Sequence, residues 1–197
     1  MSAAKSGVWP IVSISGPPGC GKSSLCQSLA DQVEGATIVA WDDYETMTTN
    51  SPDWVAGWIK RGAPYDEMLT PGLVEALQFA ANKGPVLFDT PVGRTHPQTG
   101  PLIDYAFWLA CPADIALARK VKQLSLHAST VENDAPRLFL GWLQGYLAAY
   151  EEITHAACEI QVARVLPTVD HTLDAVQPVQ FLSKCLLSDY KISFDLK

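Results

Sequence analysis

Short apolar runs alternate along the chain with longer segments in which apolar residues recur at helical spacing. The first run, residues 8–15, is rich in β-branched residues and ends at glycine and proline, as buried strands commonly do. In the next segment, residues 22–33, Leu25, Leu29 and Val33 recur every four residues, which predicts a helix. Further strands are predicted at residues 37–41, 85–89, 105–110 and 160–166, and further helices at 52–60, 71–82, 112–126, 135–157 and 176–187.

This order of elements predicts an α/β fold. Strands that are separated by helices need crossover connections, which produce a parallel sheet covered by helices on both faces. The near-continuous apolar character of the strands fits such burial. Because the chain has 197 residues, of which 48% are hydrophobic, we expect a single domain spanning residues 1–197. The expected architecture is a three-layer α/β/α sandwich with a five-stranded parallel sheet.

The loop after the first strand matches the phosphate-loop pattern G-x-x-x-x-G-K-[ST] in full. Glycines in such a loop let successive backbone N–H groups point into one concavity, and the positive end of the next helix adds to it. Lys22 is expected to reach the β- and γ-phosphates of ATP, and the Ser23 hydroxyl to coordinate Mg²⁺. The residues predicted to hold the nucleotide here are Gly16, Gly19, Cys20, Gly21, Lys22, Ser23 and Ser24.

Composition narrows the kind of partner. A formal net charge of −7 and a pI near 5.0 disfavour nucleic acid, whose phosphates require clustered basic residues. Five cysteines without C-x-x-C spacing favour reduced thiols over disulfides or a zinc site. The N-terminus lacks a signal-peptide pattern, and no apolar run approaches the roughly 20 residues of a membrane-spanning helix. We therefore expect a cytoplasmic protein, monomeric or homodimeric, that binds neither membranes nor nucleic acid.

Other classes of phosphate-loop protein fit less well. A switch-type GTPase needs a D-x-x-G turn and an N-K-x-D motif, and the sequence contains neither. Motor and AAA-type ATPases usually place Asp-Glu at the end of the third strand, where this chain has Asp89 followed by Thr90.

The sequence resembles the small P-loop kinases that include uridine kinase and phosphoribulokinase, and the resemblance covers most of the chain. The motifs that carry it are residues 16–24, Trp41-Asp42-Asp43-Tyr44 after the second strand, Val86-Leu87-Phe88-Asp89, and residues 104–120 with a Pro-x-Asp turn and Arg119. Only the first motif is specific by itself, and the others gain weight from their order. The resemblance implies a kinase that uses ATP and Mg²⁺ to phosphorylate a hydroxyl of a small metabolite such as a nucleoside, sugar or vitamin. It also implies a small helical lid, formed by segments at about 44–70 and 124–150.

The same resemblance assigns roles to individual residues, with Lys22, Asp42 and Arg119 as the catalytic set. Asp42 would accept the proton of the acceptor hydroxyl, and a carboxylate at the carboxyl end of a parallel strand does lie where ligands bind. Asp43 is the alternative base, and either aspartate could instead cap the next segment. Asp89 would orient Mg²⁺ or bind the acceptor, unless it only caps its own loop. Arg119 would pack on adenine or reach a phosphate, unless it is a solvated helix residue.

Aromatic residues after the second strand and a loop after the third form the candidate acceptor site. Tyr44 and Trp54 could line a wall for a planar or sugar-like acceptor, although Trp54 and Trp58 could equally dock their helix on the core. Arg94 is predicted to bind an anionic group on the acceptor, with an exposed loop arginine as the alternative. His96 is expected to be solvated rather than catalytic.

The chain departs from the resemblance in its shortage of arginine. Residues 122–127 carry no arginine where related kinases add more, so the charge of the transition state would fall to Lys22, Arg119, Arg137 or Arg94. This departure favours an alternative function, a regulatory nucleotide-binding module or slow ATPase without an acceptor substrate.

Cys20 lies inside the phosphate loop. The positive helix end and Lys22 would favour its thiolate, which predicts greater reactivity than that of Cys26. The alternative is that Cys20 is a small residue filling a variable loop position, with its sulfur turned away from the ligand.

Overall fold

The computed structural model describes residues 7–129 and 135–188. Five strands form one parallel sheet in the order β2-β3-β1-β4-β5. The strands are β1 (Ile11–Ser15), β2 (Thr37–Ala40), β3 (Val86–Asp89), β4 (Tyr105–Ala110) and β5 (His171–Asp174). The predicted α/β sandwich with a five-stranded parallel sheet is confirmed.

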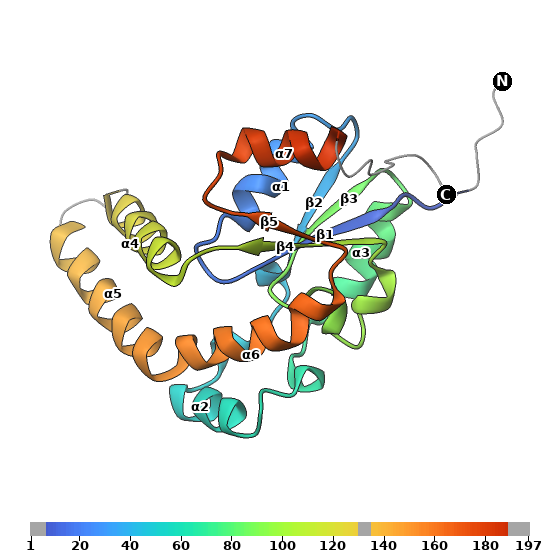
Figure 1. The fold of residues 1–197 in the computed structure, drawn as a ribbon. Coiled ribbons are helices and arrows are strands. Elements are labelled where there is room, and N and C mark those ends of the chain that lie inside the picture. The colour runs from blue at the N-terminus through green and yellow to red at the C-terminus, as the bar shows by residue number, and fades with distance from the viewer. Residues whose placement is uncertain (1–6, 130–134, 189–197) are drawn as a thin grey trace.

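Helices cover both faces of the sheet, as Figure 1 shows. On one face, α1 (Lys22–Ala30) and α7 (Val179–Ser188) bury Leu25 and Leu182 against β1 and β4. On the other face, α3 (Leu73–Ala81) and α6 (His155–Val165) bury Leu77 and Val165. The inner strands β1 and β3 are buried along their whole length, because each lies between two neighbours and two layers of helices.

The fifth strand is not where the apolar pattern placed it. Residues 160–166 were expected to form this strand, but they belong to α6 and the short turn after it. The buried residues Gln161 and Val165 are four apart, which is helical spacing. Burial of this helical face outweighs the β-branched composition that favoured a strand. The true β5 lies at the sheet edge and buries only Leu173 of its four residues, so it lacks an apolar run.

A helical arm extends past the carboxyl ends of the strands (Figure 1). It consists of α4 (Ala113–Ser129) and α5 (Ala135–Ala149), and α5 continues through a π turn, Tyr150–Thr154, into α6. The predicted helix at residues 135–157 is therefore confirmed and runs further, to Val165. The second proposed lid segment, 124–150, falls on this arm, except that residues 130–134 lie outside the described part of the chain.

The first proposed lid segment, residues 44–70, is anchored on the body of the protein. It contains α2 (Pro52–Lys60), which begins with Ser51 accepting a hydrogen bond from the backbone N–H of Trp54. Trp58 is 6% exposed and donates from its indole nitrogen to the carbonyl of Pro64. The position of Trp58 confirms its alternative role, which is to dock this helix on the core.

Candidate active site

The phosphate loop connects β1 to α1 at the carboxyl edge of the sheet. Gly19 has a φ of +82°, and a Cβ built there would lie 2.2 Å from the carbonyl oxygen of Ala116 on α4, so only glycine fits. Gly21 has a φ of +105° and forms the N-terminal cap of α1. The loop thus needs glycine both for its curvature and for its contact with the arm.

Lys22 begins α1 and folds back over the loop. Its ammonium donates to the carbonyl oxygens of Gly16 and Pro17, at 3.1 and 3.4 Å. Ser23 and Ser24 follow it and are exposed. The predicted order of loop, lysine and hydroxyl is therefore present at the start of one helix, where the helix dipole favours anions.

The hydroxyl of Ser23 donates to the carboxylate of Asp89, with 2.5 Å between the two oxygens. Asp89 ends β3 and is only 9% exposed, and this burial raises its pKa against the opposing effects of Ser23 and Lys22, while Asp42 adds to the rise. A hydroxyl and a carboxylate are the hard oxygen donors that Mg²⁺ prefers. Magnesium commonly keeps several of its waters, so two protein ligands suffice, and these residues fit the ion.

Asp42 follows β2 in a short turn, Trp41–Asp43. Trp41 is buried and meets the ring of His96 edge-on at 4.8 Å, which fixes the turn on the core. Asp42 is exposed and lines the same cavity as Lys22 and Ser23, whereas Asp43 is exposed outside it.

Lys22, Ser23 and Asp42 line a cavity of about 590 Å³ that lies between the phosphate loop, the arm and the loop after β5. Arg119 of α4 lines this cavity and donates to the carbonyl oxygens of Cys20, at 3.1 Å, and Ala175, at 2.9 Å. Arg119 is therefore held against the phosphate loop rather than solvated. Three polar residues not foreseen from the sequence also line the cavity, namely Lys120, Gln123 and Gln177.

The expectation that the environment of Cys20 favours its thiolate is wrong, whereas its order of reactivity relative to Cys26 stays a prediction. Its side chain is 2% exposed and packs in the core beside α1 and β4. Burial raises the pKa of this thiol, and although Lys22 opposes the rise, the thiolate is not favoured. Cys26 is also buried, and burial raises its pKa well above 9.0. The alternative, that Cys20 fills a variable loop position with its sulfur turned from the ligand, fits this geometry.

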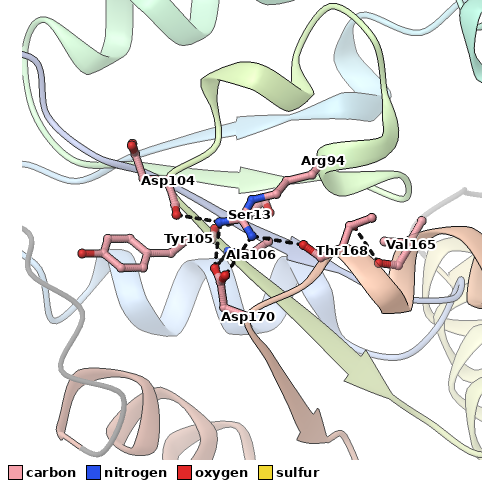
Figure 2. A network of polar contacts seen from close by, with 8 residues as sticks. All are labelled: Ser13, Arg94, Asp104, Tyr105, Ala106, Val165, Thr168 and Asp170. Carbon is pink, nitrogen blue, oxygen red and sulfur yellow. Dashed lines mark hydrogen bonds and ion pairs between the residues drawn. The ribbon is translucent and has the colours of Figure 1, made fainter.

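Arg94 does not reach the cavity, which corrects its predicted role in binding the acceptor. Its guanidinium donates to both carboxylate oxygens of Asp170, at 2.8 Å each, and to the backbone carbonyls of Thr168 and Asp104 (Figure 2). Asp104 and Asp170 directly precede β4 and β5. This network therefore lies at the amino ends of the strands, whereas the phosphate loop lies at their carboxyl ends. Within the loop after β3, Arg94 thus reaches the amino ends of β4 and β5, while His96 stays beside Trp41 at the end of β2.

The environment of Asp170 shows that the network is structural. Partial burial opposes ionisation, but the hydrogen bonds from Arg94 and from the backbone N–H of Ala106 together lower the pKa of Asp170 below 3.8. The carboxylate is therefore ionised and paired at neutral pH, and it ties the start of β4 to the start of β5.

The remaining predicted acceptor residues are spread over the body of the protein. Tyr44 is half-buried and packs on the core, whereas Trp54 is 36% exposed on α2. Neither residue lines the cavity. His96 is buried rather than solvated, with its ring nitrogens near the hydroxyl of Thr99 and the carbonyl of Met68, and burial lowers its pKa. Arg137 is exposed on α5 and does not line the cavity.

No family model and no curated protein matches the sequence. Solved structures of kinases resemble the fold, and two of them illustrate the likeness. One is a candidate fructose transport system kinase from Silicibacter sp. TM1040, with 16% identity and a TM-score of 0.56 over 88% of this chain and 93% of that one. The other is a sugar kinase from Janibacter sp. HTCC2649, with 17% identity and a TM-score of 0.52 over 93% and 95%.

The chain therefore has the fold of the P-loop kinases, and the resemblance drawn from its motifs is confirmed at the level of the fold. At 16–17% identity, these structures do not identify the substrate. Among the described residues, no helix is both long and apolar enough to cross a membrane.

Proposed function

We propose that the protein is a kinase that transfers the γ-phosphoryl group of ATP to a hydroxyl of a small metabolite. The observation that carries the proposal is that Lys22, Ser23 and Asp42, from two different crossover units, line one cavity. A cationic loop and an exposed carboxylate in one cavity supply both needs of this reaction, a phosphate site and a proton acceptor.

In this reaction, the acceptor oxygen attacks the γ-phosphorus, its proton passes to the carboxylate of Asp42, and ADP leaves. Lys22 and the N-terminal end of α1 stabilise the charge that develops on the phosphates. Ser23 and Asp89 would hold Mg²⁺, which neutralises phosphate charge when bound. Arg119 lines the side of the cavity formed by α4 and Ala175, and this side would hold the base and the α-phosphate.

The acceptor is proposed to carry no phosphate group of its own. Arg94, the predicted anion-binding residue, is paired with Asp170 at the far edge of the sheet. Arg164 of α6 is bonded to the carbonyls of Gly62 and Ala63 instead. This arrangement supports a nucleoside, sugar or vitamin over an acceptor that already carries a phosphate.

A slow ATPase or regulatory nucleotide-binding module is the second candidate. One observation favours it: among the described residues, Arg119 is the sole arginine that lines the cavity, and backbone carbonyls already engage its guanidinium. Fast phosphoryl transfer commonly uses an arginine at the transferred group.

The experiment is to measure ADP release from Mg·ATP against a panel of nucleosides, sugars and vitamins. Turnover that depends on an acceptor supports the kinase, whereas ATP binding with no acceptor response overturns it in favour of the second candidate. Lys22→Ala should abolish transfer and weaken ATP binding. Asp42→Asn should keep ATP affinity and lower kcat about a hundredfold or more, as loss of a general base does.

Asp43→Asn is the matched control, because Asp43 is the adjacent carboxylate and lies outside the cavity. It should retain the activity of the wild type. If Asp43→Asn loses turnover and Asp42→Asn keeps it, Asp43 is the base and the assignment is wrong.

A further inference from the structure

Gln161 is a buried polar residue beneath the phosphate loop that the proposed reaction does not use. It lies on α6 and is 7% exposed. Its side-chain amide donates to the carbonyl oxygen of Gly16, at 3.3 Å, and to that of Pro91. A primary amide has two N–H donors, so one side chain can satisfy both carbonyls.

The two carbonyls belong to the two loops that carry the site. Gly16 opens the phosphate loop after β1, and Pro91 lies two residues beyond Asp89 at the end of β3. The amide therefore ties the loop that carries Lys22 and Ser23 to the loop that follows Asp89. Because α6 continues through the π turn into α5, the same residue also joins the phosphate loop to the helical arm.

The carbonyl of Gly16 has a second donor, the ammonium of Lys22 at 3.1 Å. To reach a phosphate, this ammonium must give up its bonds to the loop carbonyls. A buried carbonyl left without a donor is costly, and this cost would hold Lys22 in place. With the amide of Gln161 present, the carbonyl of Gly16 keeps a partner when the ammonium moves.

We propose that Gln161 is a positioning residue that keeps the Gly16 carbonyl bonded and thereby frees Lys22 for the nucleotide phosphates. This inference rests on the proposed nucleotide site, but it assigns a function to a residue of α6 outside the phosphate-loop motif. It requires the two N–H donors of the amide, and not merely the volume of the side chain.

Two substitutions of Gln161 distinguish the effect of its N–H donors from the effect of its side-chain volume. Gln161→Met keeps the length and the buried packing but donates no hydrogen bond, so Lys22 should stay on the carbonyl of Gly16. Gln161→Glu, when ionised, would face two carbonyl oxygens and attract the ammonium of Lys22. When protonated, the same carboxyl group regains one donor. Gln78→Met is the control, because Gln78 is exposed on α3 away from the cavity.

The experiment is a calorimetric titration of each variant with Mg·ATP, with thermal unfolding to establish that each is folded. Gln161→Met is expected to weaken ATP binding about tenfold, the equivalent of one net hydrogen bond. In a Lys22→Ala background, Gln161→Met should have no further effect, because no ammonium is left to release. A purely structural role would lower affinity equally in both backgrounds.

The pH dependence of Gln161→Glu gives a second readout within one protein. Relative to wild type at each pH, its ATP affinity should rise between pH 8 and pH 5.5 as the buried carboxyl becomes protonated. An affinity ratio that stays flat with pH overturns the inference, as does a Gln161→Met loss that persists without Lys22. Failure of the wild type to bind ATP would instead overturn the proposed function itself.

Discussion

Replacing Arg94 by methionine removes the guanidinium that links the loop after β3 to the starts of β4 and β5 (Figure 2). The ion pair with Asp170 is bidentate but partly solvated, since the side chains of Arg94 and Asp170 are 27% and 36% exposed. Such a pair contributes about 1 kcal/mol, and the lost bonds to the carbonyls of Thr168 and Asp104 add about 1 kcal/mol more. The expected loss is about 2 kcal/mol, or roughly 4–8 °C in Tm for a chain of this length.

The assay is thermal unfolding between pH 3 and pH 8, together with acceptor KM once an acceptor is found. The folded-state pKa of Asp170 lies below its ordinary value, so its pairing stabilises the protein at neutral pH and this contribution is lost as pH falls through that lowered pKa. The Tm gap between wild type and Arg94→Met should therefore persist from pH 8 to pH 5 and narrow to about half below about pH 4, because the bonds to the carbonyls of Thr168 and Asp104 do not titrate. An unchanged Tm with an acceptor KM raised tenfold or more would refute this reasoning and restore Arg94 to the acceptor site.

Two further outcomes follow from burial. Cys20 should resist mild alkylation in the folded protein, with or without Mg·ATP, because its thiol is 2% exposed and burial raises its pKa; rapid labelling that ATP prevents would contradict this. Trp58→Phe should lower stability by about 1 kcal/mol, because the bond to the carbonyl of Pro64 is lost, and ATP affinity measured by titration should not change.

The parts of the fold that the sequence predicts are those where local pattern and tertiary burial agree. The boundaries of α2, residues 52–60, are matched because Ser51 and Pro52 mark its start in the sequence itself. Strand β4, residues 105–110, is an apolar run that the sheet buries on both faces. The phosphate loop is equally local, since its chemistry is contained in eight consecutive residues.

The remaining features depend on which segments meet in three dimensions. The edge strand β5 is polar on three of its four residues, and α6 is held in a helix by contacts with residues far away in the chain. The position of Arg94 follows from Asp170, which lies 76 residues further along. Gln161 meets Gly16 across 145 residues, and no motif marks it.

Asp89 provides a test of whether a buried charge in this site lowers the stability of the folded protein. Its carboxylate is 9% exposed, and burial raises its pKa, so the folded protein binds the proton more tightly than the unfolded chain does. Ionised Asp89 therefore lowers the stability of the fold. This cost appears as pH rises above the pKa of the unfolded state and is complete above the pKa of the folded state.

Asp89→Asn removes this charge and keeps an oxygen that can accept from Ser23. We expect its Tm to exceed that of wild type at pH 8, with the gain shrinking toward pH 4, while Mg²⁺-dependent ATP binding weakens. Asp43→Asn, at an exposed carboxylate, should show neither effect. A Tm gain that does not vary with pH would mean that the amide improves packing and that the buried charge carries no penalty, whereas unchanged Mg²⁺ dependence would remove Asp89 from the metal site.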